Sequence, residues 1–280
     1  MSLRDDLKAF ALNDLDMDYA GVSSVERFSE APQGYRPTDL LPGAKSVVVM
    51  AVRLLEGAVQ AISRAHDDGL RHALYIYGTH GYLLTPNLSL NFAAYRMARF
   101  FEKKGFAAAP LPSGPGGGGV AFSHRHAAVA AGLGELGWSG LFLTPDYGPR
   151  VRLVSVITKA DIEPDPLYQG PRICDPASCG VCIAGCPMGA LGTEQTNTVV
   201  IGGKTYQYGV TNTIKCFAGI EGLLKKTLGL KDLPIPEDPT WDDVNKAREQ
   251  IDPRQAREAI LINRPTYYCG KCLADCPAGK

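Results

Sequence analysis

The pattern of apolar and polar residues predicts that strands and helices alternate over the first 160 positions. The β-branched run KSVVVMAVRL (45–54) follows Pro-Gly and predicts a strand. Residues 151–159 (VRLVSVITK) alternate apolar and polar positions, as a half-covered strand does. Residues 90–104 repeat apolar side chains at helical spacing, and residues 124–131 predict a shorter helix. Residues 1–42 predict only a short helix and an irregular segment, without a strand.

The amino-acid composition of the chain changes near residue 160. Residues 161–171 are rich in Pro and Asp, and all eight cysteines follow them. Residues 198–206 (TVVIGGKTY) predict a hairpin around their two glycines, and residues 241–262 predict one or two helices. We expect an α/β or α+β layered domain over residues 1–160 and a second domain over residues 161–280.

Charge and hydropathy limit which binding partners and which cellular compartment are expected for this protein. Lys and Arg number 29, as do Asp and Glu, so the net charge is zero. Nucleic acid and anionic membranes are therefore not expected as the main partners. Asp5 and Asp6 lie where a signal peptide has its apolar core, and no run of about 18 apolar residues is present. We expect a cytoplasmic protein, in which clustered cysteines favour metal binding over disulfides.

The cysteines form two groups of similar spacing. The first group reads C-x4-C-x2-C-x3-C-P from Cys174, the second reads C-x2-C-x3-C-P from Cys269, and Cys216 lies between them. Bacterial ferredoxins hold two [4Fe–4S] clusters with similar runs, whose last cysteine ligates the other cluster. The same arrangement here predicts two clusters. One takes Cys174, Cys179, Cys182 and Cys276, and the other takes Cys186, Cys216, Cys269 and Cys272.

Three alternatives to this ligand assignment remain open. A lone cysteine such as Cys216 is often a small buried apolar residue. Two zinc sites would also use eight thiolates, although the C-x3-C-P endings favour clusters. Structural disulfides are the third alternative.

Residues 132–137 (GLGELG) match the pattern G-x-G-x-x-G. The dinucleotide-binding motif requires a strand before this sequence and a helix that opens within it. The preceding HAAVAA is more helical than extended, and Pro145 limits any helix that follows. We expect these glycines to let the backbone approach a bulky ligand or a neighbouring element.

Residues 122–161 (FSHRHAAVAAGLGELGWSGLFLTPDYGPRVRLVSVITKAD), followed by the two cysteine groups, resemble the cobalamin-dependent reductases. These comprise the epoxyqueuosine reductases and the reductive dehalogenases. Residues 43–52 and 90–110 also fit that superfamily. The resemblance is specific at this level and does not select a substrate.

The resemblance implies an α+β fold class, with a nitroreductase-like α/β domain fused to a two-cluster, bacterial-ferredoxin-like domain. It also implies a cobalamin bound base-off between them and reduced to Co(I) by a cluster. The cobalt would reduce a small-molecule substrate while a protein acid delivers a proton. A ferredoxin or flavodoxin would be the external electron donor.

Some features depart from this pattern. The Asp that is the proton donor of epoxyqueuosine reductases falls on Ala121, and no Asp or Glu lies between Ala109 and Leu133. We expect neither the helical-repeat extension of longer members nor the twin-arginine signal of respiratory dehalogenases. We therefore expect a cytoplasmic relative of both groups with an unassigned substrate.

Candidate site residues lie around residue 124. Histidine titrates near neutrality, so His124 and His126 are the predicted general acids; the alternative is a helix N-terminus capped by Ser123. Dehalogenases use a Tyr beside a basic residue as the acid, but the run YIYGTHGY (75–82) is expected mainly to pack. The predicted cofactor contacts are Ser123, Gly137, Trp138, Tyr147 and Arg150.

Three functions are therefore weighed for this chain. The first is a corrinoid-using iron–sulfur reductase, and the second is a reductase with FMN on the same scaffold. The third is a non-enzymatic electron-transfer protein that activates a partner corrinoid protein. A cofactor-sized pocket at the domain junction separates the first two functions from the third.

Overall fold

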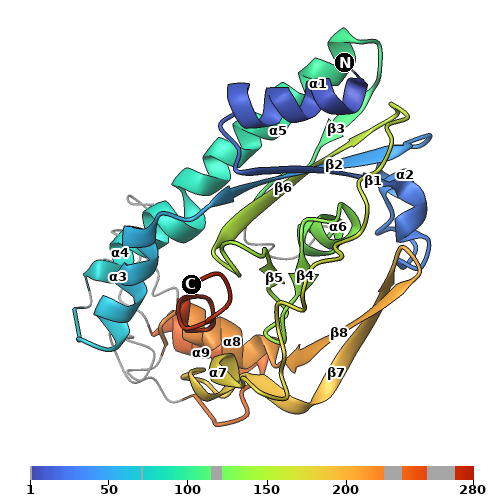
Figure 1. Cartoon of the computed structure of the whole chain (residues 1–280). Helices are drawn as coiled ribbons and strands as arrows, with labels where there is room; N and C mark the ends of the chain where they lie inside the picture. Colours follow the sequence, from blue (N-terminus) through green and yellow to red (C-terminus); the bar gives the residue numbers. More distant parts are fainter. Residues whose placement is uncertain (1, 71, 115–121, 224–234, 251–268) are drawn as a thin grey trace.

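A central antiparallel sheet organises the fold (Figure 1). The computed structural model describes residues 2–70, 72–114, 122–223, 235–250 and 269–280. The sheet has the order β1-β2-β6-β3, formed by β1 (Tyr19–Ser24), β2 (Ser46–Arg53), β6 (Val151–Thr158) and β3 (Ala108–Pro110). All neighbouring strands run antiparallel. The strands predicted at 45–54 and 151–159 are confirmed.

Both faces of the sheet are covered, which explains the uninterrupted apolar run of β2. Val48 and Met50 face a core shared with α1 (Leu3–Ala9) and α5 (Thr85–Lys103). Val47 and Val49 face a second core, shared with α6 (His124–Ala130). A strand buried on both sides loses the polar alternation of a half-exposed one. For the same reason β6 is covered more fully than its alternating sequence predicts.

The absence of a strand from residues 1–42 is a wrong prediction, because β1 pairs with β2 over six residues. The sequence of β1, YAGVSS, holds one β-branched residue and is dominated by small ones. Small residues are needed where the helix on the second face approaches. A Cβ at Gly21 would lie 2.8 Å from the carbonyl oxygen of Ala131.

The helices predicted at 90–104 and 124–131 are confirmed. α5 begins at Thr85, five residues early, with Pro86 in its first turn, where a proline is tolerated. Ser123 caps α6, because its Oγ accepts a hydrogen bond from the backbone N–H of His126 at 3.4 Å.

Residues 171–223 and 235–250 lie below the sheet in the view of Figure 1. The hairpin predicted at 198–206 is confirmed as β7 (Leu191–Ile201) and β8 (Lys204–Thr211). One of the helices predicted over 241–262 is present as α9 (Trp241–Glu249). Residues 251–262 of that prediction, and residues 115–119 of the glycine-rich loop, lie outside the described residues.

The remaining elements are short. They comprise the π-helical η1 (Phe10–Asp14) and η3 (Gly78–Leu83), the 3-10 helix η2 (Val25–Phe28), the helices α2 (Pro37–Leu40), α3 (Glu56–His66), α4 (Ala73–Tyr77), α7 (Val181–Ala184), α8 (Thr213–Ile220) and α11 (Lys271–Ala274), and the two-residue strands β4 (Glu135–Leu136) and β5 (Phe142–Leu143). The chain is thus a mixed α+β protein, as predicted. The domain boundary near residue 160 stays a prediction.

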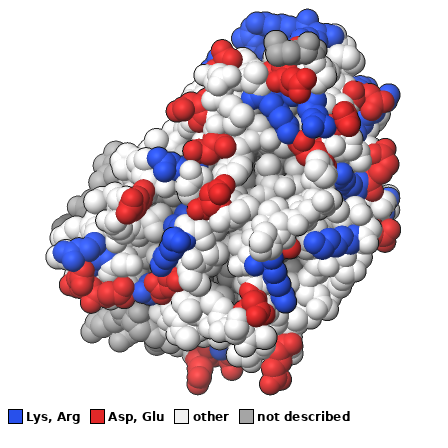
Figure 2. Space-filling view, viewed as in Figure 1, with Lys and Arg blue, Asp and Glu red and all other residues white. Residues whose placement is uncertain are grey.

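Two surface properties follow from the described residues. No described helix is both long and apolar enough to cross a membrane. On the face shown in Figure 2, Lys and Arg side chains are interspersed with Asp and Glu. This face therefore carries no field of a single sign.

Candidate functional site

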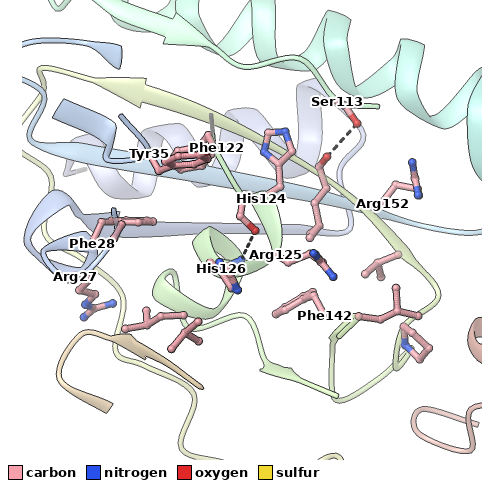
Figure 3. Close-up of a pocket in the computed structure, with 18 of the residues that line it drawn as sticks. Arg27, Phe28, Tyr35, Ser113, Phe122, His124, Arg125, His126, Phe142 and Arg152 are labelled. Atoms are coloured by element: carbon pink, nitrogen blue, oxygen red, sulfur yellow. Dashed lines mark hydrogen bonds between the residues drawn. The ribbon is translucent and has the colours of Figure 1, made fainter. Parts of the chain in front are cut away.

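A large cavity opens between α6, β6 and the hairpin strand β7 (Figure 3). Its volume is about 1150 Å³, at the upper end of what small-molecule sites offer. Aromatic walls are provided by Phe28, Phe122 and Phe142. Leu273 of α11 also lines the cavity, and it lies immediately after Cys272. The wall of the cavity thus reaches the second cysteine group.

Three arginines, Arg27, Arg125 and Arg152, give the cavity a positive charge. Figure 3 shows Arg27 and Arg152 toward opposite sides, with Arg125 between them. Arg27 donates to the carbonyl oxygen of Ala130 and Arg125 to that of Gly140. Burial lowers the pKa of both Arg27 and Arg125. Glu30 is the one acidic residue among the described residues of the lining.

The ring of His124 is held by two hydrogen bonds, one of them to a residue of β6. Its Nε2 lies 3.0 Å from the carbonyl oxygen of Pro112, and its Nδ1 lies 2.9 Å from Oγ of Ser155. Burial lowers the pKa of His124, and the charge of Arg152 adds to this effect. A neutral ring fits both contacts, with Nε2–H donating to the carbonyl and Nδ1 accepting from the hydroxyl. His124 therefore orients the Pro112 segment of the wall.

His126, two residues after His124 in α6, also lines the cavity. Burial, followed by the charge of Arg125, lowers its pKa to about 4. Its ring packs near Tyr208, with 6.1 Å between centroids. At neutral pH the ring is uncharged and lacks the readily transferred proton of an imidazolium. The acid roles of His124 and His126 stay predictions, while Ser123, His124 and His126 all line the cavity.

A polar network that the sequence motifs do not reveal surrounds Arg152. Its Nη2 and Nε donate to Oδ1 of Asn87, at 3.1 and 3.3 Å. The guanidinium lies over the ring of Tyr82, 4.8 Å from its centroid. Asn87 is only 4% exposed and also accepts from Oγ of Ser113 at 3.2 Å. These residues are distant in sequence and share no motif, so only the fold brings them together.

The two cysteine groups are built on one repeated turn. Gly180 and Gly270 follow the first cysteine of each C-G-x-C unit and have φ of 64° and 65°. Each glycine caps a four-residue helix, α7 or α11. Its carbonyl oxygen accepts hydrogen bonds of 3.0 Å from the backbone N–H groups of the residues three and four positions later in the chain. The two helices pack against each other. A left-handed residue at both positions favours glycine.

The thiols fall into two sets that influence one another. Burial raises the pKa of Cys182 to about 11, and Cys174, Cys276 and Cys179 raise it further. Burial likewise raises the pKa of Cys272, with Cys269, Cys216 and Cys186 as its main neighbours. The pKa of Cys272 is also raised by Cys182, and the assignment of the cysteines to two ligand sets stays a prediction. All eight cysteines lie within the described residues and are free thiols.

Gly137 and Trp138 lie outside the lining of the large cavity, and Trp138 contacts Cys174. The backbone N–H of Trp138 points at Sγ of Cys174 at 3.3 Å, and its indole Nε1–H donates to the carbonyl oxygen of Gly192 at 2.9 Å. A Cβ at Gly137 would lie 2.8 Å from Leu143. The Leu136-Gly137-Trp138 sequence therefore positions backbone beside a cysteine.

Tyr147 and Arg150 also lie outside the cavity lining and contact the C-terminal segment. Arg150 donates from Nη1 to the carbonyl oxygen of Cys276 at 2.9 Å and from Nη2 to that of Ala278. Tyr147 packs edge-on against Tyr19 at 6.0 Å. The sequence T-P-D-Y-G-P-R thus holds the last cysteine segment. Cofactor contact by Gly137, Trp138, Tyr147 and Arg150 stays a prediction.

The glycines of GLGELG serve close backbone packing, as one of the two sequence interpretations expects. A Cβ at Gly132 would meet the carbonyl of Pro166, and one at Gly134 would meet that of Leu143. Helix α6 precedes the motif and the short strands β4 and β5 follow it. The strand–turn–helix of a dinucleotide site is absent from this described segment.

The cysteines supply eight thiols, the donor type that iron–sulfur clusters use. Backbone N–H groups donate to Sγ of Cys174 and, from Ala190, to Sγ of Cys186, both at 3.3 Å. Such N–H···S bonds are among the contacts that tune cluster potentials. No three Cys, His, Asp or Glu side chains among the described residues form a group that could hold a metal ion.

Part of the chain is similar in sequence to reductive dehalogenases. A tetrachloroethene reductive dehalogenase of Desulfitobacterium hafniense is 37% identical over 109 residues, which are 38% of this chain and 18% of the relative. That of Sulfurospirillum multivorans is 36% identical over 104 residues, 36% of this chain and 19% of the relative. The chain thus matches less than a fifth of the length of these relatives. No family model matches the chain.

Solved structures extend the likeness to nearly the whole chain. A selenomethionine-labelled epoxyqueuosine reductase aligns with a TM-score of 0.57 and 18% identity, over 99% of this chain and 65% of the other. The Bacillus subtilis epoxyqueuosine reductase gives 0.56 and 19% over the same shares. A catabolic reductive dehalogenase gives 0.51 and 17%, over 92% and 36%. The resemblance stated from sequence is confirmed, because the neighbours of this chain include epoxyqueuosine reductases and reductive dehalogenases.

Proposed function

We propose that this chain is an iron–sulfur reductase that holds two [4Fe–4S] clusters on its eight cysteines and a corrinoid in the large cavity, where it reduces a small organic substrate. Its dehalogenase and epoxyqueuosine reductase relatives support a reductase. The single observation that carries the proposal is the position of Leu273. This residue lines the cavity and lies in α11, between Cys272 and Cys276 of the two thiol sets.

The cysteines would hold the clusters in the two sets described above. When bound, the clusters supply single electrons. The repeated turns at Gly180 and Gly270 present the thiols, and Arg150 fixes the segment of Cys276 against β6. The N–H groups that point at Cys174 and Cys186 stabilise negative charge on the sulfurs. This part of the chain is the ferredoxin-like domain of the proposal.

The cavity would hold the corrinoid and the substrate. When bound, a corrinoid supplies a strongly reducing metal centre. The rings of Phe28, Phe122 and Phe142 exclude water from the site. Arg27 and Arg125 line the cavity and would offer a positive field to amide or phosphate oxygens of a bound cofactor.

Tyr82 is the proton donor that fits this site best. It lines the cavity with Arg152 over its ring, and a Tyr beside a basic residue is the acid that the dehalogenase resemblance implies. The cation favours the phenolate that remains once the proton has left. His124, with both ring nitrogens engaged, orients the wall beside this pair.

FMN is the second candidate cofactor, because the volume and aromatic walls of the cavity also suit an isoalloxazine ring. Equilibrium dialysis of anaerobically cluster-loaded protein against hydroxocobalamin and against FMN separates the candidates. Micromolar retention of the corrinoid with weak retention of FMN is expected. The reverse result would establish the flavin reductase. Retention of neither ligand would favour an electron-transfer protein and would contradict the proposal.

A further inference from the structure

We propose that the cavity recognises a substrate with an apolar body and a carboxylate, and that Arg152 binds the carboxylate beside Tyr82. This inference rests on the proposed function and names the substrate class of that site. Arg152 carries a permanent positive charge. No ion pair of Arg152 with a carboxylate is found in the described part of the chain.

The contacts of Arg152 with the described residues use Nε, Nη2 and one face of the guanidinium. Nε and Nη2 both donate to the neutral Oδ1 of Asn87. No hydrogen-bond partner of Nη1 is found among the described residues. The groups that Arg152 influences electrostatically, Tyr77 and His124, are neutral. A cation surrounded by neutral groups gains most from an anionic partner, and a guanidinium binds a carboxylate through two hydrogen bonds.

The arrangement holds Arg152 rigidly in the cavity wall. Asn87 is buried in α5 and donates from Nδ2 to the carbonyl oxygen of Tyr82 at 3.0 Å. The same Asn87 therefore positions both the guanidinium and the backbone of the tyrosine. Side chains fixed before binding lose little entropy when a ligand arrives. An anion on Arg152 would lie next to the ring of Tyr82, 4.8 Å from the guanidinium.

The apolar residues of the cavity lining are the reason that the proposed substrate has an apolar body. Phe122, Phe142, Leu141 and Leu153 face the same cavity. An aromatic or aliphatic group buried there gains from leaving water. A free inorganic anion would use Arg152 without using these residues. The combination selects an apolar carboxylic acid.

The test compares 3-phenylpropionate with 3-phenylpropionamide, which share a body and differ in charge. Calorimetry uses cluster-loaded protein without added corrinoid. The carboxylate should bind on the order of tenfold or more tightly than the amide, and Arg152→Gln should abolish that preference. Arg152→Lys keeps the charge and should retain part of it. The matched control is Arg99→Gln, because Arg99 also lies over a tyrosine, Tyr95, at 5.8 Å but outside the cavity lining.

Four outcomes overturn the inference. They are equal affinity for acid and amide, an undiminished preference in Arg152→Gln, no binding of either probe at millimolar concentration, and Arg152-dependent binding of inorganic phosphate as tight as that of the acid. Hydroxocobalamin binding is measured separately on the same variants. If Arg152→Gln weakens only corrinoid binding, the anion belongs to the cofactor and the inference fails. Arg152-dependent acid binding without corrinoid binding would support the inference while the proposed function fails.

Discussion

Gly180 and Gly270 have nearly the same backbone conformation, with φ, ψ of 64°, 0° and 65°, −1°. Each follows a cysteine and starts a one-turn helix that carries the next cysteine. The two surroundings differ. A Cβ at Gly180 would meet nothing within 4 Å, whereas one at Gly270 would lie 2.7 Å from Ile62 and 2.9 Å from Tyr77.

Substituting these glycines should therefore cost different amounts. Gly180→Ala pays only for the left-handed backbone, about 1–2 kcal/mol of unfolding free energy. Gly270→Ala adds overpacking of about 1–3 kcal/mol. Gly203→Ala is the control, since Gly203 has φ of 77° and open space, and should match Gly180→Ala. Urea unfolding of cluster-loaded protein under argon measures all three. Equal losses for Gly180→Ala and Gly270→Ala would contradict the packing shown here.

Cys216→Ser should remove one cluster and leave the other. Cys216 belongs to the set of Cys186, Cys269 and Cys272, so about four of about eight irons per chain should remain. Cys179→Ser should also leave about four irons by removing the other cluster. Iron analysis gives the counts, and EPR of the reduced variants should show two different signals. A Cys216→Ser protein that retains about eight irons would show that Cys216 is not a ligand.

Arg150→Gln should loosen the segment that carries Cys276. The side chain donates to the carbonyl oxygens of Cys276 and Ala278, and hydrogen bonds from a charged donor contribute about 1.5–3 kcal/mol each. The variant should lose iron to a chelator at least several-fold faster than the wild type. The decay of cluster absorbance measures this rate. Arg172→Gln is the control, because Arg172 also lies near a cysteine but is 66% exposed in a weak ion pair with Asp175. Equal rates for both variants would exclude a fixing role for Arg150.

The ring of His126 should remain neutral down to acidic pH. Burial and Arg125 lower its pKa from the ordinary 6.5 to about 4. Because the folded-state pKa is the lower one, its stabilising effect is present above pH 6.5 and is lost as the pH falls toward 4. NMR of ¹³C-labelled histidine, assigned with His126→Gln, should show no titration between pH 5.5 and 8. A midpoint near 6.5 would contradict the buried position and restore His126 as a general acid.

The sequence was most informative where one local rule decides the outcome. The β-branched runs of β2 and β6, the cap at Ser123 and the hairpin at Gly202-Gly203 all form as predicted. Cysteine spacing predicts two ligand sets, because the C-x2-C turn and the following proline constrain the chain locally, and that assignment stays a prediction. Strand β1 was missed, because its small residues are required by the close packing of the segment after α6 and do not form a typical strand sequence.

The cavity could not be read from the sequence. Arg27, Tyr82, Asn87 and Arg152 come from η2, η3, α5 and β6, and no spacing rule links them. The motif residues Gly137, Trp138, Tyr147 and Arg150 were identified as important but expected at the cofactor. In the structure Trp138 contacts Cys174 and Arg150 contacts Cys276, and cofactor contact by the four residues stays a prediction.

The central claim, a corrinoid in the cavity of cluster-loaded protein, is tested most directly by EPR with cob(II)alamin under anaerobic conditions. The account predicts a bound, base-off cobalt signal in the wild type. Thr198→Trp, which fills the cavity from β7, should abolish the signal, and Thr196→Trp, on the same strand but outside the lining, should leave it intact. A spectrum of free cobalamin in the wild type at high micromolar concentration, or a bound signal that persists in Thr198→Trp, would contradict the account.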